Sequence, residues 1–486
     1  MPADRLSTAQ RRAVAELLRV APVADDLARR FAAAGHRLAL VGGSVRDALL
    51  GRLGNDLDFT TDARPEQVLA IVRPWADAVW EVGIAFGTVG CRKQAPGGAD
   101  DRHDYQIEIT TYRSEAYDRT SRKPEVSYGE SIEDDLVRRD FTVNAMAVDL
   151  PGVTFVDPYG GLDDLAARVL RTPGTPEASF GDDPLRMMRA ARFAAQLDFD
   201  VAPEVVTAMT AMADRIDIVS AERVRDELNK LVLSAHPRKG LLLLVETGVA
   251  ARVLPELPML RLELDEHHRH KDVYEHTLTV LEQAMDLETP GAPDLVLRLA
   301  ALLHDIGKPR TRRFESDGRV SFHHHEVVGA HMTKKRMKAL KYPKDVTDDV
   351  TRLVELHLRF HGYGTGEWTD SAVRRYVRDA GPLLDRLHKL TRSDCTTRNR
   401  RRATALARAY DSLEERIAKL QEQEELDAIR PDLDGNEIMR VLGVPPGPLV
   451  GRAYKHMLEL RLENGPMDHD TAVEELKKWW TAQDAG

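Results

Sequence analysis

A chain of 486 residues is too long for one ordinary domain, and a hydrophobic content of 42% supplies several cores and excludes global disorder. The net charge of −10 argues against indiscriminate binding of nucleic acid, and two distant cysteines make no disulfide framework. The first twenty residues have charges throughout, and no apolar run is long enough to span a bilayer. We expect a soluble, cytoplasmic protein of three or four domains without a membrane partner.

The order of predicted elements defines the fold class. Residues 7–34 have the pattern of an amphipathic helix, and from residue 36 to about 172 short strands alternate with glycine turns. From residue 182 onward, periodic leucine, valine and alanine predict helices almost throughout, with no convincing strand alternation. The prediction is a multidomain α+β protein, in which an N-terminal α/β head with a small sheet precedes an extended all-α portion.

The first chemically suggestive stretch is "LVGGSVRDALLGRLGNDLDFTTDA". An apolar strand ends at Gly42 and Gly43, and a helix follows with Ser44 as its expected N-cap, so free N–H groups face the turn. Asp56 and Asp58 alternate along the next strand and share one face. Two adjacent carboxylates repel each other unless a cation lies between them.

This layout predicts a nucleoside triphosphate site that uses metal ions and arginine, because the G-K-[ST] of a Walker loop is absent. The plainer alternative is a tight turn followed by two solvated acids. Either feature alone favours that alternative, whereas both together on strand–turn–helix–strand favour the nucleotide site.

The segment "VRRDFTVNAMAVDL", residues 137–150, combines two arginines with Asp140 and Asn144. Arginine binds phosphate oxygens in a bidentate manner, so Arg138 and Arg139 with Asp140 and Asn144 could grip phosphates and a ribose. A charged loop leading into a strand is the equally weighted alternative.

In "GDDPLRMMRAARFAAQLDF", residues 181–199, Pro184 predicts a helix start, and Arg186, Arg189 and Arg192 form one stripe. Asp183 and Arg186 offer an acceptor beside a donor. Cytosine and adenine present an amino donor next to a ring-nitrogen acceptor on their pairing edges, which complements this pair of side chains. Uracil and guanine present the reverse arrangement. A solvated arginine face is the alternative.

Histidines and aspartates recur on separate predicted helices of the second half. We expect His276, His304, Asp305 and Asp394 to form one metal site, because imidazole with carboxylate suits a divalent transition metal or Mg²⁺. Further candidates, some of them for a second ion, are His325 and His357, with His323, His324 and His361 in the same set. Some histidines of this set are expected to be ordinary surface or core residues that bind no metal.

Two basic runs, residues 334–344 and 398–402, stand out in this acidic chain. Either could follow a phosphate backbone. Solvated helix faces are the more common explanation of such runs.

Five motifs occur in a fixed order: "LVGGSVRDALLGRLGNDLDFTT", "RRDFTVNAMA", "DPYGGLDDL", "DDPLRMMRAARFAAQLDF" and "AERVRDELNKL". Over residues 30–265 the chain therefore resembles class II tRNA nucleotidyltransferases, the CCA-adding enzymes, and bacterial poly(A) polymerases. The His…His-Asp…Asp pattern resembles the HD phosphohydrolase superfamily. The segment "GNEIMRVLGVPPGPLVGRAYKHMLELRLENG" resembles the C-terminal part of HD-containing CCA enzymes.

The resemblance implies five parts: a leading helix (1–35), a nucleotidyltransferase head (36–172), a helical neck that binds RNA (173–265), an HD domain (266–402) and a helical tail (403–486). It implies template-independent addition of CCA to the 3′ end of tRNA from CTP and ATP. A second, phosphohydrolase activity would belong to the HD domain. The oligomeric state stays open.

By the same resemblance, Asp56 and Asp58 bind two catalytic Mg²⁺ ions. Gly42, Gly43 and Arg46 hold the triphosphate, and Asp183 with Arg186 reads the base. The remaining residues implied to bind the nucleotide are Arg139, Asp140, Asn144 and Arg189. Residues 222–228 would act as a structural brace, and Glu108 could add a third carboxylate.

Three other functions compete. A poly(A) polymerase shares the head, but its relatives tend to lack an HD domain and to carry a basic tail, unlike this chain. A metal-dependent HD phosphohydrolase with a merely nucleotide-binding head would leave the intact motifs around Asp56 and Asp58 unexplained. A pure RNA-binding module fits poorly with the negative charge and the lack of an aromatic RNA-recognition motif.

Overall fold

The computed structural model describes residues 7–8, 11–12, 14–16, 22–52, 54–81, 83–84, 87–94, 104–113, 128–129, 131–262, 272–316, 320–360, 363, 368–396, 399–424 and 430–484. The chain forms two compact units, Met1–Val253 and Leu254–Gly486. Of the predicted leading helix, α2 (Pro22–Ala33) is described, whereas most of residues 7–21 and His361 lie outside the described residues. The five-part division stays a prediction.

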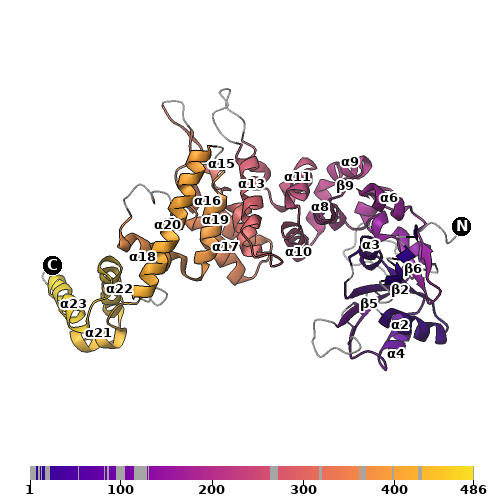
Figure 1. Cartoon of the computed structure of the whole chain (residues 1–486), viewed down its shortest axis with the longest axis horizontal. Helices are drawn as coiled ribbons and strands as arrows, with labels where there is room; N and C mark the ends of the chain where they lie inside the picture. Colours follow the sequence, from indigo (N-terminus) through magenta and orange to yellow (C-terminus); the bar gives the residue numbers. More distant parts are fainter. Residues whose placement is uncertain are drawn as a thin grey trace. The chain divides into compact units, whose positions relative to one another are not determined.

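Unit 1 contains one mixed sheet of seven strands, part of which is labelled in Figure 1. The strand order is β3-β4-β5-β2-β1-β6-β7. Only β2 and β5 pair in parallel among these neighbours. The strands are β1 (Leu38–Val41), β2 (Asp56–Thr61), β3 (Ala78–Trp80), β4 (Thr88–Lys93), β5 (Tyr105–Thr111), β6 (Ala147–Leu150) and β7 (Thr154–Val156). The α/β head with a small sheet is therefore confirmed.

Burial explains these strands. All four residues of β1 are buried because the strand pairs on both sides, with β2 and β6. In β5 the buried and exposed residues alternate, as expected of a strand with one face on the core. Around the sheet lie α3 (Gly43–Leu49), α4 (Pro65–Val72), α5 (Ile132–Val137), α6 (Gly161–Ala167) and a short 3₁₀ helix, Thr142–Asn144.

The expected N-cap at Ser44 is wrong. Gly42, at φ +70°, is the N-cap, and the helix begins at Gly43. Because glycine adopts this left-handed turn without strain, the helix can start one residue earlier. The Ser44 hydroxyl instead donates to the carbonyl of Asp56 (3.0 Å) and accepts from the backbone N–H of Asp58 (3.1 Å), which ties α3 to β2.

The rest of unit 1 is helical. It contains α7 (Pro176–Asp182), α8 (Leu185–Leu197), α9 (Pro203–Ala211), α10 (Ala221–Val232), α11 (Pro237–Glu246), α12 (Ala250–Val253) and a 3₁₀ helix, Ala213–Ile218. Helix α8 packs against α10 and α11, and the buried carboxylate of Glu227 on α10 accepts from Arg192 on α8 at 2.6 Å. This ion pair agrees with a bracing role for residues 222–228.

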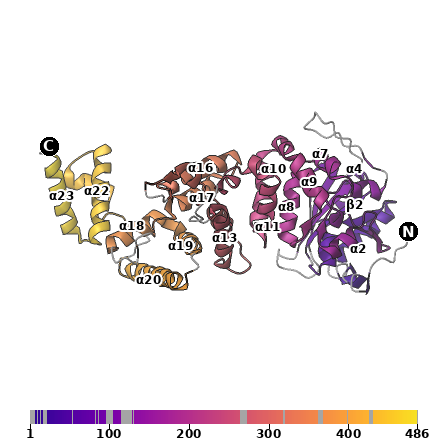
Figure 2. The same ribbon diagram turned by 90° about the horizontal axis from the view of Figure 1, so that it is seen from above.

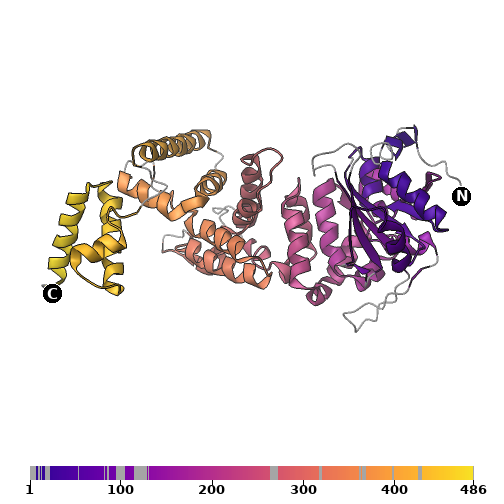
Figure 3. The ribbon, with the colours of Figure 1, turned by 90° about the horizontal axis from the view of Figure 1, so that it is seen from below.

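Unit 2 is a helical assembly (Figures 2 and 3). Its first part contains the 3₁₀ helices Pro258–Leu260 and Gly381–Leu383 and the helices α13 (Val273–Asp286), α14 (Leu295–Leu303), α15 (Lys308–Thr311), α16 (His325–Ala339), α17 (Lys344–Leu356), α18 (Asp370–Ala380), α19 (Leu384–Ser393) and α20 (Arg400–Glu424). The last part contains α21 (Gly435–Leu442), α22 (Pro448–Asn464) and α23 (His469–Asp484) around a separate apolar cluster that includes Ile438, Met457 and Leu476.

Two short strand pairs place strands β9, β10 and β11 in the portion predicted as helical. They are β8 (Val169–Leu170) with β9 (Asp200–Val201) in unit 1, and β10 (Arg313–Phe314) with β11 (Val320–Ser321) in unit 2. Each strand has only two residues, too few for alternation to be visible in the sequence. No helix in the described part of the chain is both long and apolar enough to cross a membrane.

Candidate functional site

Unit 1 contains a cavity of about 630 Å³, a size usual for small-molecule sites. It lies where the start of α3, the beginning of β2, the segment after α5 and the start of α8 meet. Apart from Glu108, every residue of unit 1 predicted to bind metal or nucleotide lines it: Gly42, Gly43, Arg46, Asp56, Asp58, Arg139, Asp140, Asn144, Asp183, Arg186 and Arg189.

The carboxylate of Asp58 on β2 lies near the positive charge of Arg139. Burial raises the pKa of Asp58, the positive charge of Arg139 lowers it, and the negative charges of Glu108 and Asp56 raise it again; the net shift is upward. The parallel register places Glu108 of β5 directly beside Asp58. The ionised form of Asp58 is thus disfavoured by its surroundings, and a divalent cation on these oxygen ligands would stabilise it. The donor set fits Mg²⁺.

Glycine lets arginine approach these acids. A Cβ atom on Gly42 would lie 2.8 Å from the Nη1 of Arg139 and 3.7 Å from a carboxylate oxygen of Asp58. On Gly43 it would lie 3.6 Å from the Nη2 of Arg46. The two glycines therefore leave room for guanidinium groups at the floor of the cavity.

A hydrogen-bond chain crosses the cavity wall. The buried Arg46 donates to the side-chain oxygen of Asn144 at 2.6 Å, and the amide of Asn144 donates to Asp140 at 2.9 Å. The other Asp140 oxygen accepts two bonds from Arg189, at 2.8 and 2.5 Å. Burial raises the pKa of Asp140, but attraction by Arg189 and the bonds from Asn144 and Arg189 lower it well below its usual range. Asp140 is therefore an ionised anchor that orients Asn144 and Arg189.

The side chains of Asp183 and Arg186 line the same cavity but do not bond to each other. Asp183 lies between α7 and α8; one oxygen accepts from the N–H of Leu185 (3.1 Å) and the other from Arg223 (2.6 Å). Arg186 donates to Ser179 and to the carbonyl of Arg138. Separate neighbours thus hold the two side chains, which line one cavity as an acceptor and a donor.

Sequence reasoning missed three further residues of the cavity wall, Phe193, Arg223 and Lys230, whereas Arg138 belongs to the arginine pair considered with Asp140 and Asn144. Phe193 lies under the guanidinium groups of Arg46, Arg189 and Arg192, at 5.1, 5.5 and 3.9 Å from its centroid. Arg223 belongs to the segment interpreted only as a brace. Its position four residues before Glu227, one turn away on the same face of α10, is the signal that could have revealed it.

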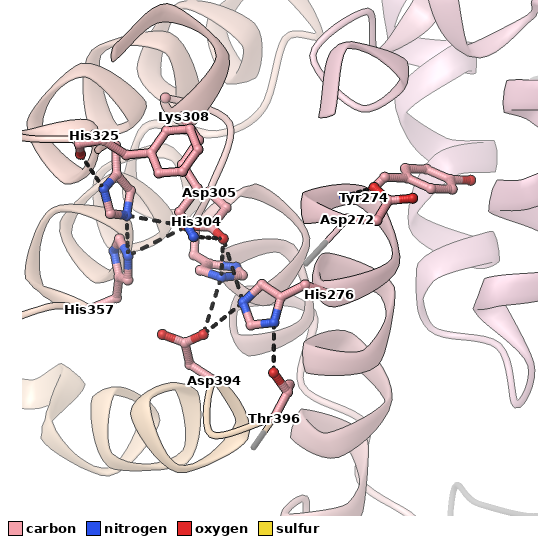
Figure 4. A network of polar contacts seen from close by, with 12 residues as sticks. Asp272, Tyr274, His276, His304, Asp305, Lys308, His325, His357, Asp394 and Thr396 are labelled. Atoms are coloured by element: carbon pink, nitrogen blue, oxygen red, sulfur yellow. Dashed lines mark hydrogen bonds and ion pairs between the residues drawn. The ribbon is translucent and has the colours of Figure 1, made fainter. Parts of the chain in front are cut away.

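Unit 2 brings six predicted metal ligands together from different helices (Figure 4). They form two triads whose ligand atoms lie within 4.8 Å of one another: His276, His304 and Asp394, and Asp305, His325 and His357. The Nε2 of His276 lies 2.9 Å from Asp394, and the Nε2 atoms of His325 and His357 lie 3.3 Å apart.

Asp305 links the two triads. Its Oδ2 lies 3.2 Å from His304 and 3.5 Å from His276, whereas its Oδ1 lies 3.2 Å from His325 and 4.0 Å from His357. Lys308 donates to the same Oδ2 at 2.6 Å (Figure 4). A carboxylate with one oxygen toward each triad has the geometry of a ligand that bridges two cations.

The orientation of the histidines also fits metal binding. The Nδ1 atoms of His304, His325 and His357 donate to the carbonyls of Ala301, Phe322 and Val354 at 2.8, 2.8 and 2.6 Å, and that of His276 lies 2.9 Å from the Thr396 hydroxyl. Each ring therefore turns its Nε2 toward the cluster. This second set of bonds is typical of metal-ligating histidines.

The electrostatics of the cluster shows that its carboxylates attract positive charge, which a bound cation would supply. Burial lowers the pKa of His304, but Asp305 and Asp394 raise it to about 10 overall. Burial and the charge of His304 lower the pKa of His357 to about 3, which keeps its imidazole neutral as a ligand must be. The buried Nε2 of His304 and Oδ1 of Asp305 have no hydrogen-bond partner, so a bound cation would satisfy them.

The structure decides between the three consecutive histidines. His325, at the start of α16, is buried in the cluster, whereas His323 and His324 are exposed. A sequence cannot distinguish them, because only the turn that starts α16 sets which ring faces inward.

An α/β head with paired aspartates beside an arginine-lined cavity, followed by a His/Asp cluster on helices, defines a nucleotidyltransferase joined to an HD domain. Three family models match: the poly A polymerase head domain (residues 38–171), the probable RNA and SrmB-binding site of polymerase A (198–260) and the HD domain (273–421).

Whole-chain comparisons agree. The A-adding tRNA nucleotidyltransferase of Deinococcus radiodurans is 37% identical, over 87% of this chain and 91% of its own. A CCA-adding enzyme of Streptococcus thermophilus is 31% identical over 92% of both. The fold matches that of the Bacillus stearothermophilus CCA-adding enzyme in complex with CTP, with a TM-score of 0.66, 24% identity and coverage of 99% and 100%. The chain belongs to the tRNA nucleotidyltransferase family, which confirms the resemblance.

The close packing at Gly307 generates a prediction. A Cβ atom there would lie 2.2 Å from the carbonyl oxygen of His325 and 2.7 Å from the N atom of Gly329, so Gly307→Ala must displace the start of α16 from Asp305. We expect metal affinity in unit 2 to fall at least about tenfold, measured by titration with Mn²⁺ or Ni²⁺.

The control is Gly451→Ala in α22, where a Cβ would meet nothing within 4 Å. Both variants should show the helical content of the wild type. Unchanged metal affinity in a folded Gly307→Ala protein would contradict the ligand assignment of His325.

Proposed function

We propose that the protein adds C, C and A to the 3′ end of tRNA from CTP and ATP, without a nucleic-acid template and with Mg²⁺ bound in the head. The observation that carries this proposal is the single cavity in which Asp56 and Asp58 meet the arginines and the Asp183–Arg186 set. Family membership supports the tRNA substrate, since relatives across nearly the full chain are named CCA-adding enzymes.

In the proposed mechanism, the head residues position the primer and the nucleotide and form no covalent bond with either. Asp56 and Asp58 would hold Mg²⁺, which when bound lowers the pKa of the primer 3′-hydroxyl and neutralises the pyrophosphate. Arg46 and Arg139 lie near these acids and would bind triphosphate oxygens. Because little covalent chemistry falls to the protein, the rate depends on placing hydroxyl and α-phosphate in line.

The base would be selected by side chains. Asp183 would accept from the amino group shared by cytosine and adenine, and Arg186 would donate to the adjacent ring nitrogen. Arg223 holds the Asp183 carboxylate in place at 2.6 Å, so the acceptor is oriented before a nucleotide binds.

A narrower activity is the second candidate. The relative from Deinococcus radiodurans, 37% identical, is named an A-adding enzyme, so this chain could add only the final A. Poly(A) addition, considered from the sequence, would instead extend an RNA end repeatedly with A.

For the six ligands in unit 2 we propose a second, metal-dependent phosphohydrolase activity that uses a divalent transition metal or Mg²⁺. It is supported by two triads bridged by Asp305, because a pair of divalent ions can bind both the attacking and the leaving oxygen of a phosphate ester.

The first test separates the three polymerising activities. With tRNA that ends at the discriminator base, CCA addition gives two added C with CTP alone and complete CCA with CTP and ATP, read from product lengths on a gel. An A-adding enzyme extends only tRNA already ending in CC, and a poly(A) polymerase gives a long ladder with ATP.

In the same assay, Asp58→Asn should lower the rate of addition at least about a hundredfold while tRNA binding persists, because the lost charge acts on the triphosphate. The matched control is Asp163→Asn on α6, which removes an exposed carboxylate. Wild-type addition by Asp58→Asn would refute the metal assignment.

The second test concerns base choice. Asp183→Ala should lower the preference for CTP over UTP about tenfold to a hundredfold, since a paired set of hydrogen bonds contributes roughly 1–3 kcal/mol of discrimination. The measurement is the ratio of kcat/KM for the two nucleotides, with Glu177→Ala at an exposed position of α7 as control. An unchanged ratio would mean that the base is read elsewhere.

The third test asks whether the two chemistries are independent. His304→Ala should abolish hydrolysis of a 2′,3′-cyclic nucleotide and reduce metal content, whereas CCA addition continues, because unit 1 has its own carboxylates. Both activities are measured on one preparation with added Ni²⁺, Mn²⁺ or Mg²⁺, beside the exposed His324→Ala as control. Loss of CCA addition in folded His304→Ala would contradict separate sites.

A further inference from the structure

The sheet of unit 1 carries a row of four paired residues that begins at the proposed metal site. Asp58 of β2 pairs with Glu108 of β5, which pairs on its other side with Gly90 of β4. Gly90 in turn pairs with Trp80 of β3. Residues directly opposite each other on neighbouring strands turn their side chains to the same face of a sheet. Glu108 and Trp80 therefore share the face that presents the Asp58 carboxylate.

The indole of Trp80 leans from β3 over β4 toward these carboxylates. A Cβ atom on Gly90 would overlap the Nε1 atom of Trp80 and lie 2.7 Å from its Cδ1, so the ring fills the space that a side chain would need. Because strands lie about 4.8 Å apart, a ring over β4 is about 10 Å from Asp58, two strands away. Trp80 is half-buried and Glu108 is exposed, so a ligand on this face can reach both.

The cations of the site lie on the other side of Asp58. In the strand order β5-β2-β1, Glu108 belongs to one neighbour of β2, whereas Gly42 directly follows the other. A Cβ atom on Gly42 would lie 2.8 Å from the Nη1 of Arg139, and Arg46 belongs to the helix that begins after this glycine. The proposed triphosphate contacts are therefore on the β1 side of the carboxylates, and the row that leads to β3 is on the β5 side.

The geometry of nucleotide transfer then sets where the RNA lies. The 3′-oxygen of the RNA forms a bond to the α-phosphorus, the bond to the pyrophosphate oxygen breaks with its electron pair, and the hydroxyl proton passes to water. The attacking and leaving oxygens lie in line on opposite sides of the phosphorus. Because the proposed arginine contacts hold the pyrophosphate on the β1 side, the 3′-hydroxyl approaches from the β5 side. The last nucleotide of the RNA therefore lies over the row that contains Glu108 and Trp80.

We propose that Trp80 stacks on the unpaired base of the last RNA nucleotide and so places its 3′-hydroxyl beside the carboxylates of Asp56 and Asp58. Stacking suits this position because every base has a π face, so one ring serves a 3′ end that changes with each added nucleotide. Trp80 binds the RNA and takes no part in making or breaking bonds. This inference rests on the nucleotide addition proposed for the same site.

The test uses the full chain with Mg²⁺, ATP and a tRNA that ends in CC, because addition of the final A is common to CCA-adding and A-adding activities. This tRNA is compared with one whose last nucleotide lacks its base, by the kcat of addition and the KM for ATP. In the wild type we expect the missing base to lower kcat at least about fivefold, because the stacking contact is lost. The KM for ATP should not change, because ATP binds on the β1 side.

Two variants disturb the ring in different ways. In Trp80→Leu, which keeps an apolar side chain on β3, kcat should be low with both tRNAs, and the missing base should change it no more than about twofold. Trp80→Phe should regain most of the dependence on the base, because it restores a π face. Gly90→Ala leaves Trp80 in the chain, but its Cβ must displace the indole, so the dependence on the base should fall as in Trp80→Leu.

The control is Val79→Ala, which weakens the packing of the same strand on the opposite face and should keep the wild-type ratio of the two kcat values. An aromatic ring over a glycine also stabilises strand pairing. If Trp80 did only this, Trp80→Leu would lower kcat for both tRNAs and leave their ratio unchanged. That result, or a wild-type kcat that ignores the missing base, would overturn the inference while nucleotide addition stands. Addition of A to neither tRNA by the wild type would overturn both.

Discussion

Two buried aspartates, Asp140 in unit 1 and Asp305 in unit 2, stay ionised in surroundings that exclude most water. Burial alone raises the pKa of each, and in both cases cationic neighbours reverse the shift. A buried charge of this kind requires partners in defined places, because an uncompensated ion in a low dielectric is very costly. The side chains that satisfy Asp140 are those that line the proposed nucleotide cavity, and those that surround Asp305 are the proposed metal ligands.

The same constraint explains the glycines. Charged groups can meet only if the backbones that carry them come close, and a side chain at Gly42 or Gly307 would occupy that space. At Gly42 the space admits the guanidinium of Arg139 next to Asp58. At Gly307 it lets the backbone of α16 pack against the segment that contains Asp305, so His325 reaches the cluster. Glycine in both motifs serves close approach, and at Gly42 also a left-handed turn.

Two chemistries of phosphate thus occupy separate compact units of one chain. Each unit has its own carboxylates, its own cations and its own buried anchor, so the proposed transfer of nucleotides and the proposed hydrolysis of phosphate esters need no shared residue.

The sequence alone determined the fold class and nearly all residues of both sites, since strand alternation, glycine turns and the order of motifs depend on local spacing. Tertiary structure decided what spacing cannot express. It placed His325, and not His323 or His324, in the cluster, made Ser44 a link to β2 instead of an N-cap, and brought Arg223 into contact with Asp183. In each case the deciding contact joins separate elements, and only packing fixes which face of an element turns toward its neighbour.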